Sequence, residues 1–82
     1  MNPKIFKKLK HAGFYTKEEM ERFLDNPPIP TFDILAEKLG GDLWGLRREG
    51  TKWSAFRTAE VGVAGETARD ALGNLWLKIF DK

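Results

Sequence analysis

The feature that most constrains the fold is the spacing of apolar residues near the C-terminus. Between residues 67 and 80 they recur every three or four positions, at Ala68, Ala71, Leu72, Leu75, Trp76, Ile79 and Phe80. This spacing is typical of a helix with one buried stripe. Thr67 stands where an N-cap belongs and Asp70 follows it, which predicts a capping box with Asp in place of Glu or Gln. We therefore expect a C-terminal helix that the rest of the chain covers.

Composition bounds the class of protein. The 82 residues, 41% of them hydrophobic with three Trp and six Phe, suffice for one small domain with an aromatic-rich core. We treat 1–82 as a single domain, with a helical segment over 1–26 and an α-β-β-(β)-α unit over 31–82. The absence of Cys excludes a disulfide framework and a cysteine-bound zinc. No apolar run reaches the ~20 residues of a membrane span, and no signal peptide is expected at the N-terminus.

A first, basic helix is predicted from Asn2, its cap, to Gly13, which ends it. Its inward stripe consists of Ile5, Phe6, Leu9 and Ala12. The opposite face consists of Lys4, Lys7, Lys8 and His11. Residues 1–17 contain five Lys and no acid, whereas the rest of the chain has nine basic and twelve acidic residues. This face is a candidate contact for phosphate or an acidic partner; the alternative is a solvated face that keeps the protein soluble.

Two further helices are expected before the strands. Thr16 and Glu19 form a capping box at the start of the second, and Pro27 ends it because the α region is disfavoured for the residue before a proline. Its apolar stripe is predicted to be Met20, Phe23 and Leu24. Thr31 caps the third, which closes at Gly40. Its apolar side is predicted to be Phe32, Leu35, Ala36 and Leu39.

The apolar period then changes to two, which predicts strands over 42–48 and 51–58 around a turn at Glu49-Gly50, and a short third strand at 61–63. A two-residue turn places Leu46 opposite Trp53 and Trp44 opposite Ala55, on the face toward the last helix. The other face then pairs Arg47 with Lys52 and Leu43 with Phe56. A three-residue loop with a Gly bulge stays open and shifts this register. The fold class is α+β: short N-terminal helices, then a two- or three-stranded antiparallel sheet packed on a C-terminal amphipathic helix.

Residues for catalysis are scarce. Ser54 is the single Ser and His11 the single His, and Ser54 lies mid-strand without the turn that exposes a nucleophile. The acids of the second helix are interpreted as a solvated face. No metal-ligand set and no cofactor motif is present, so we expect a protein that is not an enzyme. Residues 62–65 match the G-x-x-G of some RNA-binding loops, but we interpret them as a turn.

The outer hairpin face is the second candidate binding surface. Arg47, Lys52 and Phe56 combine cations with an aromatic ring, as binders of single-stranded nucleic acid do. The alternative is that Phe56 packs under the N-terminal helices.

The C-terminal third resembles the end of many small phage and prophage proteins of unknown function. The residues that carry this resemblance are Gly65-Glu66-Thr67, Asp70-Ala71-Leu72 and Asn74-Leu75-Trp76. The same strand–turn–helix end is similar to HicB-type antitoxins, whose fold binds a small toxin. The order of a helix over 32–39, three strands and a helix over 68–80 is that of a double-stranded-RNA-binding domain. That family clamps phosphates with a Lys cluster at the start of its last helix, where this chain has Arg69 beside Asp70.

Two hypotheses of function follow. The first is a small non-enzymatic binding protein of phage or mobile-element type that acts through a protein partner, in the cytoplasm of a bacterial host. The second is a nucleic-acid-binding module that uses the basic N-terminal helix and the outer hairpin face.

Overall fold

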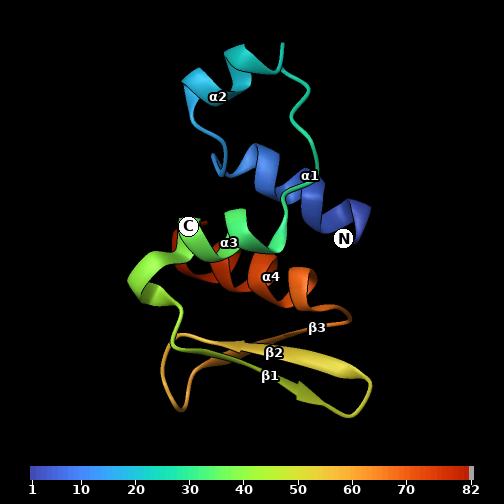
Figure 1. The fold of residues 1–82 in the computed structure, drawn as a ribbon, viewed down its shortest axis with the longest axis vertical. Coiled ribbons are helices and arrows are strands. Elements are labelled where there is room, and N and C mark those ends of the chain that lie inside the picture. The colour runs from blue at the N-terminus through green and yellow to red at the C-terminus, as the bar shows by residue number, and fades with distance from the viewer. Residues whose placement is uncertain (82) are drawn as a thin grey trace.

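The computed structural model describes residues 1–81, and α4 lies at its centre (Figure 1). The sheet covers one side of α4, α3 and α1 pack on the other side, and α2 lies at the far end of the molecule (Figure 1). The elements, in chain order, are α1 (Pro3–His11), α2 (Lys17–Arg22), α3 (Phe32–Leu39), a 3-10 turn (Gly40–Asp42), β1 (Gly45–Glu49), β2 (Lys52–Phe56), β3 (Gly62–Gly65) and α4 (Ala68–Phe80). The α+β class is confirmed, with a three-stranded antiparallel sheet in the order β1-β2-β3.

The core surrounds α4 on more than one side. Its buried apolar residues are Leu9, Phe14, Tyr15, Leu35, Leu39, Ala55, Ala71, Leu72, Leu75 and Trp76. Two glycines permit close approaches to this helix. A Cβ at Gly65 of β3 would lie 2.3 Å from the Ala71 backbone nitrogen, and one at Gly73 would lie 3.1 Å from Ile5 of α1. The helix is therefore buried over a wider arc than one amphipathic stripe, because both the sheet and the other helices need its surface.

The expected helix starts are present, with one difference at α4. Thr16 and Glu19 form the complete capping box of α2. At α4 the Thr67 hydroxyl accepts from the Asp70 N–H at 3.1 Å, as predicted. The Asp70 carboxylate, however, accepts from the Asn2 N–H at 2.8 Å, and Asp70 is buried. The second half of the predicted capping box is thus used to bind the start of α1 to the start of α4.

Helix α2 ends earlier than predicted. Leu24 and Asp25 have φ values of 53° and 60°, in the left-handed region that side chains with a Cβ disfavour. The Asp25 N–H donates to the Met20 carbonyl at 2.8 Å, which closes the helix before Pro27 is reached. Leu24 is 88% exposed, so its assignment to the apolar stripe was wrong. Phe32, placed on the inner side of α3, is 43% exposed, whereas Leu35 and Leu39 are buried.

The hairpin register differs from the predicted one by two residues. Leu46 pairs with Ala55, and the Glu49–Lys52 pair closes a turn at Gly50-Thr51 rather than at Glu49-Gly50. Gly50 has a φ of 64°, which suits the first central position of a type II′ turn. Because side chains alternate, a shift of two residues keeps each one on its expected face. Leu46, Trp53 and Ala55 therefore lie on the face toward α4, as predicted, although every predicted cross-strand partner was wrong.

Trp44 and Leu43 are the exceptions to those faces: Leu43 was expected on the outer face but packs against the core, and Trp44 was expected toward α4. The Trp44 N–H donates to the Phe56 carbonyl at 2.7 Å, although Phe56 is the register partner of Gly45. Two residues at the start of β1 thus face one residue of β2, which is the pattern of a β-bulge. The bulge turns Trp44 away from α4, and its side chain is 65% exposed. Trp76 is buried as expected, but its edge-to-face aromatic partner is Phe14 rather than Trp44.

Candidate functional site

The outer face of the sheet, on the side away from α4, carries a cluster of two aromatic rings and one arginine. Trp44 meets Phe56 edge-to-face, with ring centroids 6.3 Å apart. The Arg47 guanidinium carbon lies 5.2 Å from the Phe56 ring centroid. We call Trp44, Phe56 and Arg47 the aromatic–arginine cluster. The prediction that Phe56 packs under the N-terminal helices is wrong, because its neighbour Ala55 occupies the buried face and Phe56 takes the opposite one.

Local structure holds each member of this cluster in place. A Cβ at Gly62 would lie 2.6 Å from the Phe56 ring, so the ring can occupy this place over β3 only because the strand has a glycine there. Arg47 is held by Glu49 on its own strand, with Nη2 2.5 Å and Nε 3.0 Å from Oε1. The bulge at the start of β1 adds Trp44. The result is an exposed aromatic surface whose arginine is oriented before any partner arrives.

Arg47 and Arg57, the residue that follows Phe56, are each balanced by an acid. Arg47 pairs with Glu49, and Arg57 lies 3.4 Å from Asp42. Both pairs are largely exposed, so each is worth little to stability. Their effect is to remove the excess positive charge that a phosphate-binding surface needs.

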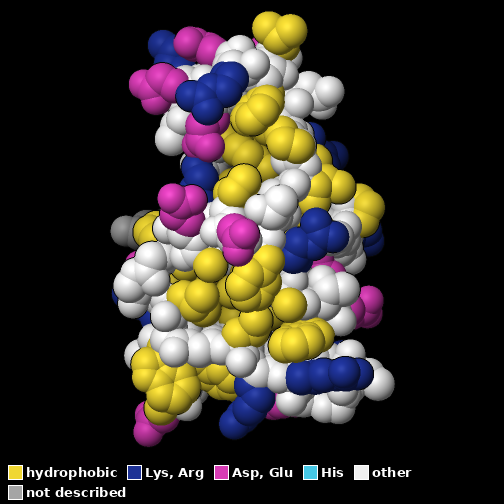
Figure 2. Space-filling view, in the orientation of Figure 1, with side chains coloured by type: hydrophobic (Ala, Val, Ile, Leu, Met, Phe, Trp, Pro, Cys, Tyr) yellow, Lys and Arg dark blue, Asp and Glu magenta, His cyan; other side chains and the backbone are white. Residues whose placement is uncertain are grey.

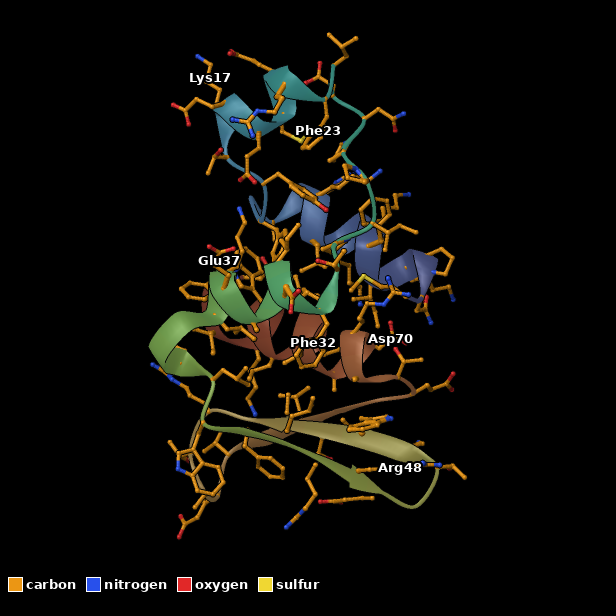
Figure 3. All side chains as sticks on the ribbon, viewed as in Figure 1. Lys17, Phe23, Phe32, Glu37, Arg48 and Asp70 are labelled. Atoms are coloured by element: carbon orange, nitrogen blue, oxygen red, sulfur yellow. The ribbon has the colours of Figure 1, made fainter. Side chains whose placement is uncertain are left out.

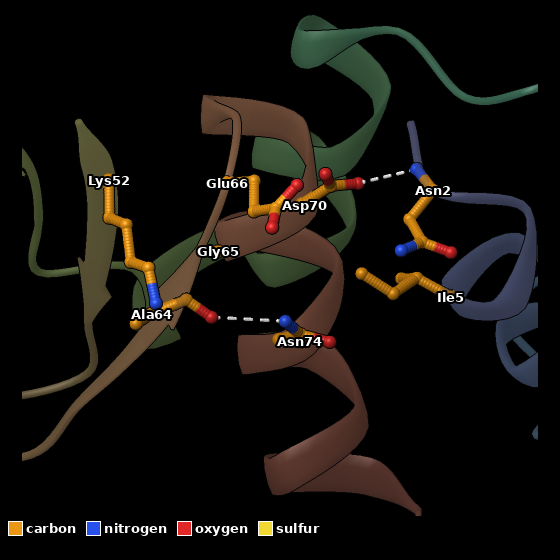
Figure 4. A pocket seen from close by; sticks show the side chains of 8 residues that line it. All are labelled: Asn2, Ile5, Lys52, Ala64, Gly65, Glu66, Asp70 and Asn74. Atoms are coloured by element: carbon orange, nitrogen blue, oxygen red, sulfur yellow. Dashed lines mark hydrogen bonds between the residues drawn. The ribbon is translucent and has the colours of Figure 1, made fainter.

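Lys52 does not join the cluster. It lies at the opposite end of β2 from Phe56, about 13 Å away along the strand. It lines a cavity of about 260 Å³ between β3 and the starts of α1 and α4 (Figure 4). The other lining residues are Asn2, Ile5, Ala64, Gly65, Glu66, Asp70 and Asn74.

The basic face of α1 is a separate surface. Lys4, Lys7, Lys8 and His11 are all exposed, and within residues 1–81 none of them is in an ion pair. Figure 1 shows α1 and the sheet on opposite sides of α4. The seven predicted site residues therefore fall on three regions: the lysine face of α1, the aromatic–arginine cluster, and the cavity that Lys52 lines. Ser54 lies on β2 between Arg47 and Ala64, on a different element from His11.

No protein-family model, curated protein or solved structure matches this chain. Within residues 1–81 no helix is long and apolar enough to cross a membrane. The same residues contain no cluster of three or more His, Asp or Glu side chains that could hold a metal ion.

Two features of the surface were missed by the sequence reasoning. The first is Trp44, because its outward position depends on a bulge that leaves no mark in the apolar period. The second is the scatter of exposed apolar residues elsewhere. Hydrophobic side chains run along one face from the α2 end to the sheet (Figure 2), and Phe23 and Phe32 are among the exposed ones, at α2 and at the start of α3 (Figure 3).

A partly buried ionic network joins α2 to the rest of the molecule. The Lys38 ammonium donates to the Phe14 carbonyl at 2.8 Å and to Glu19 at 2.5 Å. The Lys38 hydrogen bond, and then that from the Thr16 backbone, lower the pKa of Glu19. Burial, with a smaller effect from the Glu19 charge, raises the pKa of Tyr15 to about 12. The Tyr15 hydroxyl donates to the Pro28 carbonyl at 2.6 Å. These contacts attach α2 and the proline-rich connector to the core.

Proposed function

We propose that this chain is a small non-enzymatic binding protein of phage or mobile-element type that acts through a protein partner, in the cytoplasm of a bacterial host. The observation that carries the proposal is the aromatic–arginine cluster, with Trp44 65% exposed on a sheet face that no other element of residues 1–81 covers. Trp and Arg are the residues most enriched at the centres of protein interfaces. An exposed Trp of this kind offers a large apolar area to a partner pocket.

The charges of this face support a protein partner over a nucleic acid. Arg47 and Arg57 each have an acidic neighbour, so their positive charge is offset before any ligand binds. A groove for single-stranded nucleic acid combines stacking rings with an uncompensated basic track. The rings are present here, but Lys52, the cation of this face that has no ion pair within residues 1–81, lies about 13 Å from Phe56 along β2, and one lysine does not make a basic track.

Site-specific photocrosslinking tests the proposal. A photoreactive residue placed at Ser54, on the outer face beside Arg47, should crosslink a protein in the bacterial cytoplasm. The same residue placed at Glu37, on the exposed side of α3, is the matched control and should not. With the partner purified, Trp44→Ala should reduce affinity by about 30-fold, as expected for truncation of an interface hot spot of about 2 kcal/mol.

The outcome that contradicts the proposal is a partner whose affinity is the same for the parent and for Trp44→Ala. Crosslinks formed from Glu37 and not from Ser54 would likewise move the interface away from the sheet.

A nucleic-acid-binding function is the second candidate, and one observation favours it. The α1 face presents three lysines without acidic partners within residues 1–81, on a helix free of acids in its first turn. Titration of single- and double-stranded RNA and DNA at two salt concentrations tests it. Phosphate contacts by Lys4, Lys7 and Lys8 should give a log–log salt slope of roughly −2 to −3, since each contact contributes about −0.7 to −0.9. An affinity that does not change with salt would exclude this function.

A further inference from the structure

The two outer strands of the sheet differ in how their edges are protected. Strand β1 begins with a bulge and then has three consecutive charged residues, Arg47, Arg48 and Glu49. Both features discourage another strand from pairing. Strand β3, Gly62–Gly65, has no charged residue and no proline, and its largest side chain is a valine. Its edge therefore lacks the protection that β1 has.

The backbone of β3 presents hydrogen-bonding groups along this edge. The Arg57 N–H donates to the Val61 carbonyl at 2.9 Å, so these two residues form a hydrogen-bonded pair of the β2–β3 ladder. Bonded and non-bonded pairs alternate in an antiparallel ladder. With Ala55 opposite Val63, it follows that Gly62 and Ala64 direct their N–H and C=O groups away from β2. Both residues are exposed.

A side chain already uses one of these groups. The Asn74 amide of α4 donates to the Ala64 carbonyl at 3.0 Å (Figure 4). This contact confirms independently that the Ala64 carbonyl points outward. Asn74 thus occupies the place that the donor of a neighbouring strand would take.

The cavity of about 260 Å³ lies beside this edge, and its lining selects a kind of ligand (Figure 4). Ile5 contributes an apolar wall, and Asn2 and Asn74 contribute amides. Lys52 lines the same cavity as Ala64, and within residues 1–81 it has no ion pair. Glu66 and Asp70 line it as well, and the Asp70 carboxylate already accepts from the Asn2 N–H. The cavity therefore presents one cation and two carboxylates next to outward-facing backbone groups.

We propose that the β3 edge and this cavity bind an extended peptide segment of a partner protein as a fourth strand, with an acidic side chain of the peptide paired to Lys52 and a basic one to Glu66. An extended backbone supplies donors and acceptors at the alternating spacing that Gly62 and Ala64 present. The small side chains of β3 allow that backbone to approach. This site uses none of the aromatic–arginine cluster, so it stands or fails separately from the function proposed above.

Selection from a library of short random peptides, followed by affinity measurement on the selected peptides, tests this proposal. Ala64→Pro removes the outward N–H, and proline is tolerated on the free side of an edge strand. Ala64→Ser keeps that N–H and is the matched control. We expect Ala64→Pro to weaken binding by about tenfold or more and Ala64→Ser by less than about twofold, since a lost hydrogen bond and a blocked edge act together.

Three further variants sharpen the test. Asn74→Ala frees the Ala64 carbonyl and should tighten binding by about threefold. Lys52→Glu should reverse the preference for an acidic side chain, so that a peptide with Lys in its place recovers affinity. Glu37→Ala, on the exposed side of α3, should leave peptide affinity unchanged.

N-methylation of the peptide decides the matter on the unmodified protein, even where Ala64→Pro fails to fold by circular dichroism. Only every second peptide residue bonds to β3. Methyl groups on the backbone nitrogens of those residues should abolish binding, whereas methyl groups on the residues between them should be tolerated. The proposal is overturned if both sets of methylated peptides bind as tightly as the unmethylated peptide. It is also overturned if the selected peptides bind folded Ala64→Pro as tightly as the parent, or if the library yields no peptide that distinguishes the two.

Discussion

Trp76 and Trp44 show how different the covered and uncovered sides of this small molecule are. Both were expected in one core, yet Trp76 is 7% exposed against Phe14 and Trp44 is 65% exposed against Phe56. The covered side consists of α4, the inner face of the sheet and the helices packed on them. The uncovered side consists of the outer sheet face and the lysine face of α1. Substitutions on the covered side should change stability, whereas those on the uncovered side should change binding.

The largest expected effect is on the two tryptophans themselves. Trp76→Ala should lower the free energy of unfolding by about 3–5 kcal/mol, the usual range for truncating a core aromatic. Trp44→Ala should lower it by about 1 kcal/mol or less, because it loses one aromatic pair at the surface. Denaturant unfolding of both variants measures the difference. Equal effects would mean that the bulge does not turn Trp44 outward in solution.

Glycines offer a second version of the same comparison. Gly65→Ala should be destabilising by about 1–3 kcal/mol, the range for overpacking, because its Cβ would lie 2.3 Å from the Ala71 backbone nitrogen. Gly45, at the start of β1, has nothing within 4 Å of such a Cβ, so Gly45→Ala is the matched control and should be nearly neutral. Thermal melts of the two variants provide the measurement. If Gly65→Ala melts with the parent, β3 does not approach α4 this closely.

The residue pattern predicted the covered side better than the uncovered one, for a physical reason. Every second residue of a strand faces the core, so the alternation of apolar residues alone placed Leu46 and Ala55 on the inner face, although their cross-strand partners were predicted wrongly. It also predicted α4 and its Thr67 cap. The bulge at Trp44 and the left-handed turn at Leu24 each depend on the backbone conformation of one or two residues, which the spacing of apolar residues does not predict.

The candidate site was predicted in part for the same reason. Arg47 and Phe56 were expected on one face and do meet there, because strand alternation fixes that face. Lys52 was expected beside them but lines a cavity with Asn2, since a register shift of two residues moves it to the end of the hairpin. The tie between Asp70 and Asn2 joins residues 68 positions apart, which local pattern cannot predict.

The cap of α4 gives an intermediate effect on the covered side. Thr67→Ala should lower stability by about 1 kcal/mol, because the Asp70 N–H loses its acceptor. Thr67→Ser keeps the hydroxyl and should be close to neutral. Chemical denaturation distinguishes them. Should the two variants behave alike, the hydroxyl is not the cap.

The Glu19–Lys38 pair should give a smaller, pH-dependent effect. The pKa of Glu19 is lowered in the folded state, so its contribution is present above its ordinary pKa and is lost as the pH falls through the lowered value. Glu19→Gln keeps a side chain able to complete the capping box but removes the charge. We expect it to be less stable than the parent by about 0.5–1 kcal/mol near neutral pH.

Melting temperatures of parent and variant measured down to strongly acidic pH test this expectation. Their difference should shrink as Glu19 of the parent becomes protonated. A difference that stays constant with pH would mean that the hydrogen bonds, not the charge, matter here.

The smallest expected effect on stability belongs to the lysine face of α1. Lys4, Lys7 and Lys8 are exposed and lie opposite the buried Leu9, so changing all three to Gln empties no core position. Isolated surface changes are usually worth within about 0.5 kcal/mol, and the melting temperature should stay within a few degrees of that of the parent. Affinity for an anionic partner should fall. The fall should be larger at low salt than at high salt, because at high salt screening already weakens these contacts in the parent.

Trp44→Ala gives the complementary result if the partner is a protein on the sheet face: lost affinity that does not depend on salt. A partner that binds the triple variant as tightly as the parent at low salt would show that this face only solvates the protein. The aromatic–arginine cluster would then carry the binding alone.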